Sequence, residues 1–149
     1  EAGVRGIDIG GLGGTSFSAV EYYRAKKEGM SLKERLGQTF WEWGIPSPIS
    51  LLLADVGLPL IATGGLRNGL DVARALALGA HAGGMASQML RAANESAEAV
   101  VQALEEVVAE IKAVHLLTGA ANVADLAETR TIFTGPTREW AASLGLREA

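Results

Sequence analysis

Residues 58–67 read Leu-Pro-Leu-Ile-Ala-Thr-Gly-Gly-Leu-Arg. The first six form a short apolar run typical of a buried parallel strand, and the paired glycines Gly64 and Gly65 end it just before a helix begins. At such a strand-to-helix turn, free backbone N–H groups can bind a phosphate. This stretch therefore predicts a parallel α/β fold that holds a phosphorylated cofactor.

The helix after this turn has clear start and stop signals. Asn68 can cap its amino terminus, and Asp71 can reach back toward the N–H of the capping residue. An almost wholly apolar segment follows and ends at Gly79, which suits a helix packed closely on a sheet. A second strand is predicted at residues 82–86, before Ser87. Together these segments form one βαβ unit whose strand ends point the same way.

The same pattern occurs near the start of the chain. A strand is predicted over Val4–Ile9, and it is followed by Gly10-Gly11-Leu12-Gly13-Gly14-Thr15-Ser16. Four glycines in five positions indicate that a ligand approaches the backbone closely, rather than that the glycines serve packing. Thr15 and Ser16 add hydroxyl groups that can bond a phosphate or a ring carbonyl. The alternative is a flexible surface turn.

Composition limits the possible functions. With 149 residues, 48% of them hydrophobic, the chain can bury the core of one domain. A net charge of −4 without a basic cluster, and 5% aromatic residues, argue against nucleic-acid partners and against anionic membrane surfaces. We expect no membrane span and no signal peptide. The absence of cysteine excludes disulfides, thiolate catalysis and zinc–thiolate sites, and it is compatible with the cytoplasm.

The two histidines do not indicate a metal site. His81 lies in the predicted link between a helix and a strand. His115 falls near the end of a long predicted helix, where its side chain interacts favourably with the helix dipole. We therefore predict no metal ligand in this chain.

The chain is predicted to be the carboxyl-terminal part of a larger protein. It begins with Glu1-Ala2-Gly3 rather than with methionine, and it enters a buried-type strand within a few residues. Only three parallel strands are expected, and a sheet of that size leaves long unpaired edges.

Six further helices are expected. Ser31 and Glu34 form a predicted capping box at the start of the second of them. The predicted helices span Ser18–Glu28, Ser31 to about Trp43, about Pro48–Val56, Glu95–Leu117, Val123–Ala127 and Thr137–Leu144.

An arginine and two tryptophans near these elements allow a functional interpretation. Arg67 lies one residue past the paired glycines at a helix entry, where it can meet a phosphate, and the alternative is a salt bridge to Asp71. Trp41 and Trp43 could form an exposed substrate cage. Because aromatics at i and i+2 point to different helix faces, packing of one of them in the core or at a subunit contact is favoured.

Several segments together resemble the type 2, flavin-dependent isopentenyl-diphosphate isomerases. Their order and spacing match along nearly the whole chain, and the full set is specific, whereas the glycine pair and arginine alone fit many flavin barrels. The matching segments are residues 7–16, 43–46, 63–71, 84–86, 117–120 and 137–140.

The resemblance implies a (β/α)8 TIM barrel with FMN at the carboxyl edge of its strands. This chain would supply about the last three βα units and the long helix (about residues 1–120) and a helical closing tail (about 121–149). The implied cofactor-binding residues are Thr15 and Ser16 near the flavin, Gly64, Gly65, Leu66 and Arg67 at its phosphate, and Ala86 and Ser87 completing the phosphate cup. Gln88 after Ser87 departs from the usual continuation of the family.

The activity implied by the resemblance is the isomerisation of isopentenyl diphosphate to dimethylallyl diphosphate in isoprenoid biosynthesis, with reduced FMN as acid and base. Mg²⁺ and NADPH are implied as well, with the metal ligand in earlier strands outside this chain. Glu21 matches a family carboxylate that faces the flavin, which implies a proton relay. The alternative for Glu21 is a solvent-facing helix glutamate.

Two other functions stay open. An FMN-dependent oxidoreductase of the 2-hydroxy-acid oxidase type shares the glycine–arginine phosphate signature, although its catalytic histidine and arginine belong ahead of this position. The other is an inactive barrel fragment that only associates through its strand edges. The expected partner is a missing amino-terminal barrel portion or further copies of the chain.

Overall fold

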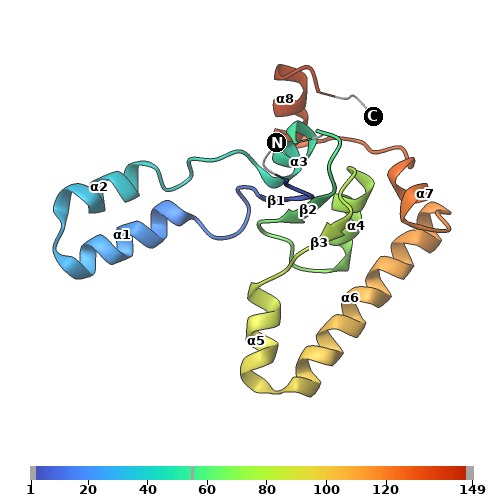
Figure 1. The fold of residues 1–149 in the computed structure, drawn as a ribbon, viewed down its shortest axis with the longest axis horizontal. Helices are drawn as coiled ribbons and strands as arrows, with labels where there is room; N and C mark the ends of the chain where they lie inside the picture. The colour runs from blue at the N-terminus through green and yellow to red at the C-terminus, as the bar shows by residue number, and fades with distance from the viewer. Residues whose placement is uncertain (1–2, 55, 147–149) are drawn as a thin grey trace.

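A three-stranded parallel sheet forms the centre of the protein in the computed structural model, which describes residues 3–54 and 56–146 (Figure 1). The strands are β1 (Ile7–Gly10), β2 (Leu60–Thr63) and β3 (Ala82–Gly83), in that spatial order. This confirms the predicted parallel α/β arrangement. The first predicted strand, at Val4–Ile9, starts later than expected, and the third, at residues 82–86, is shorter.

The pairing register brings the carboxyl ends of the strands to one edge. Ile7 pairs with Leu60 and Gly10 with Thr63, and Ile61 pairs with Ala82. Because all the strands run parallel, the loops after β1, β2 and β3 leave the sheet on the same side.

One face of the sheet is covered and the other is open. Two helices, α3 (Ser47–Leu53) and α4 (Gly69–Ala77), cover the face that carries Ile9, Leu60 and Ala62. These three residues are buried and form the first core cluster together with residues of the two helices. The alternate residues Asp8 and Ile61 are exposed, with Ile61 at 41%. The predicted end of α3 includes Asp55, which lies outside the described residues.

A long helix, α6 (Ala97–Thr118), packs on the outside of α4 together with α7 (Val123–Ala127). Their contact is the second core cluster, which consists of Val72, Ala73, Leu76, Ala120 and Leu126. α5 (Ser87–Glu95) precedes α6 and folds back against it as a hairpin (Figure 1).

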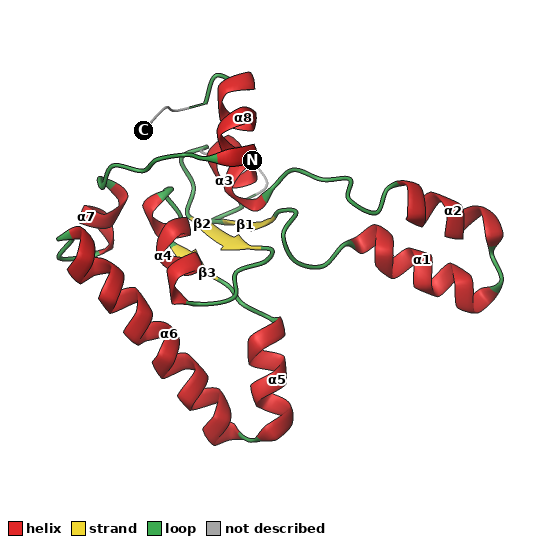
Figure 2. Cartoon of the chain, turned by 180° about the vertical axis from the view of Figure 1, so that it is seen from behind, coloured by secondary structure: helices red, strands yellow, loops and turns green. Residues whose placement is uncertain are grey.

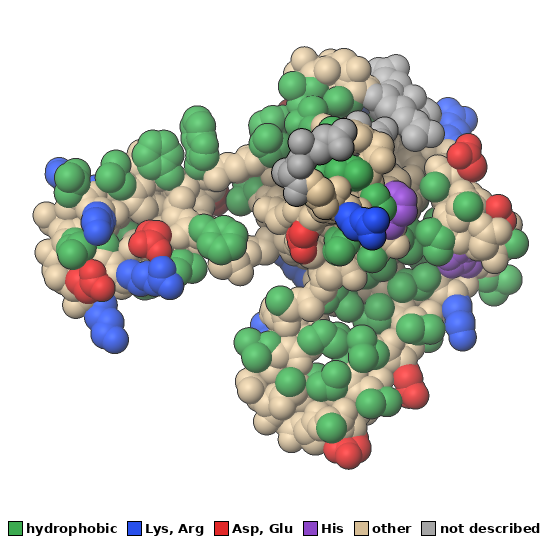
Figure 3. Space-filling view, in the orientation of Figure 1, with side chains coloured by type: hydrophobic (Ala, Val, Ile, Leu, Met, Phe, Trp, Pro, Cys, Tyr) green, Lys and Arg blue, Asp and Glu red, His purple; other side chains and the backbone are tan. Residues whose placement is uncertain are grey.

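The helices α1 (Phe17–Glu28) and α2 (Ser31–Thr39) form an arm that extends away from the sheet (Figure 2). They pack mainly against each other, and Gly37 allows the contact because a Cβ there would meet Tyr22. Figure 3 shows apolar side chains along this arm and over the α5–α6 hairpin.

The last helix, α8 (Gly135–Ser143), lies against α3. No helix in the described part of the chain is long and apolar enough to cross a membrane.

The structure corrects two helix predictions. The cap of α2 is Met30 without a side-chain hydrogen bond, so Ser31 and Glu34 do not form a capping box, and α2 ends at Thr39 instead of near Trp43. α5 was not predicted. It is separated from α6 by Ser96, whose extended backbone and hydroxyl cap the next helix, with the Ser96 Oγ accepting the Ala99 N–H at 3.0 Å.

Candidate functional site

Two loops meet at the carboxyl edge of the sheet. Leu12, after β1, forms a parallel bridge with Pro46, and the Leu12 N–H donates to the Ile45 carbonyl at 2.8 Å. Ser47 donates its N–H to the Leu12 carbonyl at 3.0 Å, and its hydroxyl donates to the Gly64 carbonyl after β2. Ser47 therefore ties the two loops together. This role has no signal in the sequence, because a serine between two prolines indicates only a chain break.

The glycines of the two loops pack against one another. A Cβ on Gly64 would overlap the carbonyl oxygen of Gly11, and one on Gly65 would overlap that of Gly13. Gly64 and Gly65 also have φ angles of +90° and +98°, a backbone conformation that residues with a side chain rarely adopt. The prediction that the glycines after β1 do not serve packing is therefore wrong. Gly11, Gly13 and Gly14 let the two backbones approach each other.

The two hydroxyl residues at the end of the first loop have different environments. Ser16 caps α1 by accepting the Ala19 N–H at 3.1 Å, and its hydroxyl donates to the Trp41 carbonyl at 2.5 Å. Thr15 is exposed, and among the described residues no hydrogen bond of its hydroxyl is recorded. Of the two, Thr15 has the hydroxyl that is free for a ligand.

Side chains of the protein itself satisfy the amino terminus of α4. The side-chain oxygen Oδ1 of Asn68 accepts the Asp71 N–H at 2.8 Å, which confirms the predicted cap. The Asp71 carboxylate accepts the Arg67 N–H at 3.2 Å, one residue earlier than predicted. Glu110, from α6, accepts the Gly69 N–H. These contacts leave little of the α4 amino terminus for an anion.

The side chain of Arg67 is exposed beside this terminus. The salt bridge to Asp71 considered above is not found, because the Asp71 carboxylate pairs instead with Arg74 at 3.2 Å. The Arg67 guanidinium is thus able to meet an external anion.

The amino terminus of α5 contrasts with that of α4. Its cap residue is Ala86, no side chain caps it, and Ser87 is exposed. The buried Gln88 Oε1 has no hydrogen-bond partner among the described residues. An uncapped helix start presents free N–H groups and the positive end of the helix dipole.

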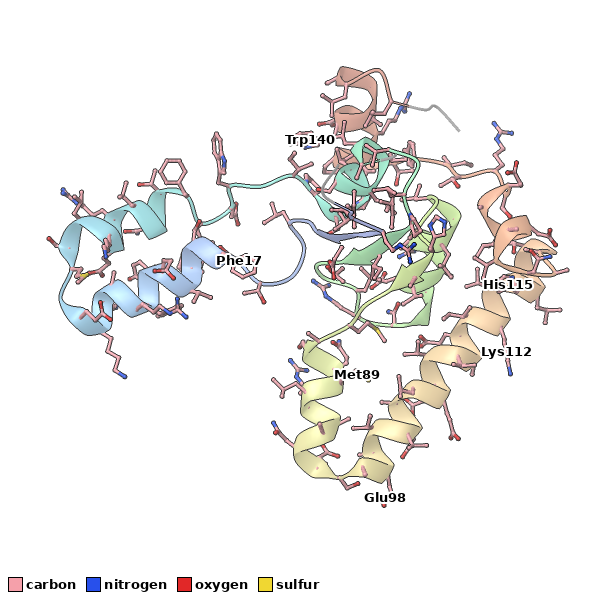
Figure 4. All side chains as sticks on the ribbon, viewed as in Figure 1. Phe17, Met89, Glu98, Lys112, His115 and Trp140 are labelled. Carbon is pink, nitrogen blue, oxygen red and sulfur yellow. The ribbon has the colours of Figure 1, made fainter. Side chains whose placement is uncertain are left out.

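Glu21 is not brought to the strand edge. It lies on α1, with its side chain 60% exposed, and pairs with Arg24 at 2.6 Å. Figure 4 shows α1 running outward from the labelled Phe17.

The two tryptophans belong to the base of the arm and do not form a cage. Trp41 packs edge-to-face on Tyr22 and Tyr23, at centroid distances of 5.6 and 5.9 Å. Trp43 is 80% exposed and contacts Phe40.

The histidines make structural contacts. The His81 Nδ1 accepts the Leu60 N–H at 3.3 Å, and the His115 Nδ1 lies 3.1 Å from the Ala120 carbonyl at the end of α6 (Figure 4). In residues 3–54 and 56–146, no group of three or more acidic or histidine side chains could hold a metal ion.

The fold and this edge define a class, the α/β proteins that bind ligands where parallel strands end. Within it, the sequence profile of the FMN-dependent dehydrogenase family matches residues 44–132, and the chain belongs to this family. The matched region includes α3, β2, α4, β3 and the helices up to α7.

Curated relatives support the resemblance described from the sequence. The chain is 50% identical over 140 residues to an isopentenyl-diphosphate delta-isomerase of Thermoplasma volcanium, covering 94% of this chain and 40% of the relative. It is 48% identical over 145 residues to one of Methanosarcina mazei, covering 97% and 40%. The resemblance to isopentenyl-diphosphate isomerases is thereby confirmed. The chain spans about two fifths of the length of these relatives.

The residues at the strand edge fit the phosphate of FMN. The uncapped start of α5 offers backbone N–H donors, and the exposed Arg67 guanidinium, which forms no ion pair with a carboxylate of the described residues, offers side-chain donors. β2 and β3 are adjacent strands, so their terminal loops are neighbours. A phosphate is the ligand that such backbone and guanidinium donors bind best.

Proposed function

We propose that this chain is the carboxyl-terminal part of an FMN-dependent isomerase that interconverts isopentenyl diphosphate and dimethylallyl diphosphate. The observation that carries the proposal is the 43–50% identity to isopentenyl-diphosphate delta-isomerases over more than nine tenths of the chain. The family assignment supports FMN as the cofactor. The role in isoprenoid biosynthesis, the use of Mg²⁺ and NADPH and a cytoplasmic location are parts of the same proposal.

In this proposal the chain supplies about the last three βα units of one barrel, and residues from about 121 onward form its closing tail. The open sheet face with Asp8 and Ile61 would then line the barrel interior. Its partner is the remaining portion of the barrel, and association of copies of this chain is the alternative.

The proposed phosphate site combines two neighbouring loops. Gly64, Gly65 and Leu66 shape the first loop, and the Arg67 guanidinium neutralises the phosphate. At the start of α5, the free backbone N–H groups at Ala86 and Ser87 donate to the phosphate. Because Ser16 is already hydrogen-bonded within the protein, Thr15 is the hydroxyl that we propose contacts the flavin.

When bound in its reduced form, FMN supplies the acid and base that move a proton at the allylic carbon. The chain's own residues hold the phosphate and fix the strand edge. We propose that Glu21 relays a proton, which requires the arm to cover the strand edge in the complete protein.

A complementation experiment tests the proposed function. The chain is co-expressed with the part of the Thermoplasma volcanium relative that lies outside the matched 140 residues, and the product is called the complemented protein below. We expect it to carry FMN and to isomerise isopentenyl diphosphate, whereas either part alone does neither. Oxidation of a 2-hydroxy acid with no isomerisation would instead favour the oxidoreductase. A complex without flavin or turnover would contradict both.

A further inference from the structure

The carboxylate of Asp71 holds the backbone of Arg67 and does not pair with its side chain. One oxygen, Oδ2, accepts the Arg67 N–H at 3.2 Å, and the other, Oδ1, accepts from the Arg74 guanidinium at 3.2 Å. The N–H of Asp71 donates in turn to Asn68 at 2.8 Å. Asp71 is thus fixed by three contacts, and its side chain is only 28% exposed.

This arrangement keeps the Arg67 guanidinium free. An aspartate four residues after an arginine on a helix start is a natural ion-pair partner for it. Here Arg74 occupies that carboxylate, while Arg67 is held through its main chain. The side chain of Arg67 can therefore leave the α4 surface for an anion.

We propose that Asp71 is a positioning residue for Arg67. It fixes the backbone from which the guanidinium reaches the cofactor phosphate, and it touches no cofactor itself. The inference rests on the proposed function, because it takes the FMN phosphate as the anion.

The chain contains a second copy of the same cap, without an arginine. At the start of α7, Asn122 accepts the Asp125 N–H at 3.0 Å, and the Asp125 carboxylate accepts the Ala121 N–H at 3.0 Å. Asp125 therefore does for Ala121 what Asp71 does for Arg67. Substitution of Asp125 is a matched control, since it removes the same contact between a carboxylate and a backbone N–H far from the phosphate loop in sequence.

The experiment compares FMN with riboflavin, which lacks the phosphate, in the complemented protein. Dissociation constants for both are measured by flavin fluorescence for the wild type, Asp71→Ala, Asp71→Asn and Asp125→Ala. The dissociation constant for riboflavin divided by that for FMN measures the contribution of the phosphate alone. The thermal unfolding temperature measures the loss of stability when the cap is removed.

We expect Asp71→Ala to lower this ratio about fivefold, as loss of one hydrogen bond allows, while riboflavin binding changes little. Asp71→Asn keeps an acceptor for the Arg67 N–H and should restore most of the ratio. Asp125→Ala should lower the unfolding temperature but leave the ratio unchanged.

The outcomes separate the two proposals. A wild-type protein that prefers FMN, together with an unchanged ratio in Asp71→Ala, would overturn the positioning role and leave the proposed function intact. An equal fall in Asp125→Ala would also overturn it, because the effect would then be general destabilisation. A wild type that binds FMN no better than riboflavin would overturn the phosphate site and the positioning role together.

Discussion

At the scale of single residues, the phosphate site depends on the chemistry of Arg67. Its exposed guanidinium offers planar donors to a phosphate, and a charge-assisted contact of this kind is stronger than a neutral hydrogen bond. We expect Arg67→Ala to raise the Kd of the complemented protein for FMN about tenfold or more. Arg67→Lys should give an intermediate value, because lysine keeps the charge but loses the two-pronged geometry. Equilibrium dialysis measures both constants.

The control for this prediction is Arg35→Ala, on the arm, which should leave FMN affinity unchanged. If Arg67→Ala binds FMN as tightly as the wild type, Arg67 does not belong to the site.

Glu21 allows a separate test of proton transfer. In the complemented protein, Glu21→Gln should lower kcat about a hundredfold with unchanged flavin content, because the amide cannot relay a proton. Glu28→Gln, a substitution at another glutamate of α1, is the matched control and should keep the full rate. A Glu21→Gln protein at full rate would leave Glu21 as the exposed partner of Arg24 that the structure shows.

At the scale of elements, the contact between the two glycine loops has a measurable cost when it is disturbed. Gly65 and Gly79 have nearly the same φ, +98° and +100°, but a Cβ at Gly65 would overlap Gly13, whereas a Cβ at Gly79 meets open space. We expect Gly79→Ala to lower the free energy of unfolding by about 1 kcal/mol through φ alone. Gly65→Ala should cost about 3 kcal/mol more because the backbones must separate.

Urea unfolding of the two variants measures this difference. Equal losses of stability would show that the loops do not touch in solution, and would remove the packing role assigned to these glycines.

The amino terminus of α6 predicts a dependence of stability on pH. The backbone N–H of Glu98, and then the Ser96 hydroxyl, donate to the Glu98 carboxylate and hold its pKa below the usual 4.5. A carboxyl group whose pKa is lowered by folding stabilises the folded state above its unfolded pKa, and the effect is lost as the pH falls through the folded pKa. Glu98→Gln should therefore be less stable than the wild type at pH 7 and nearly equal to it at pH 2.

Urea midpoints at the two pH values check this prediction, and a carboxyl NMR titration gives the pKa of Glu98 directly. A Glu98 pKa at or above 4.5 in the folded protein would contradict it.

Local signals in the sequence predicted most elements but not the contacts between them. The helices up to α4 and the three strands follow from apolar periodicity and from caps such as Asn68. The long helix was predicted to begin at Glu95, close to the observed start of α6, but α5 before it was missed, because Ala86 stands at its cap position and no capping side chain marks its start. The Ser47 tie and the glycine contact were unpredictable because they join residues that are distant along the chain.

At the scale of the whole molecule, large apolar surfaces stay uncovered. The outer face of α6 carries Val101, Leu104 and Val108, which line an apolar groove at 47–55% exposure. Apolar surfaces of this kind, together with the open sheet face, are typical of regions that another protein segment covers. We expect native mass spectrometry to show the chain alone as flavin-free oligomers, and the complemented protein as one copy of each part with one FMN. A monomeric chain that binds FMN by itself would contradict the split-barrel proposal.

The α1–α2 arm is expected to unfold locally more easily than the core of the protein. Its helices bury little beyond their mutual contact and join the sheet through two extended linkers, held at the base by the bond from Ser16 to Trp41. Local opening of the arm therefore breaks few contacts elsewhere, and we expect its amide protons to exchange with deuterium sooner than those of β2 and α4. If the arm covers the strand edge in the complete protein, as the proposed role of Glu21 requires, it can open and close there while the core stays folded.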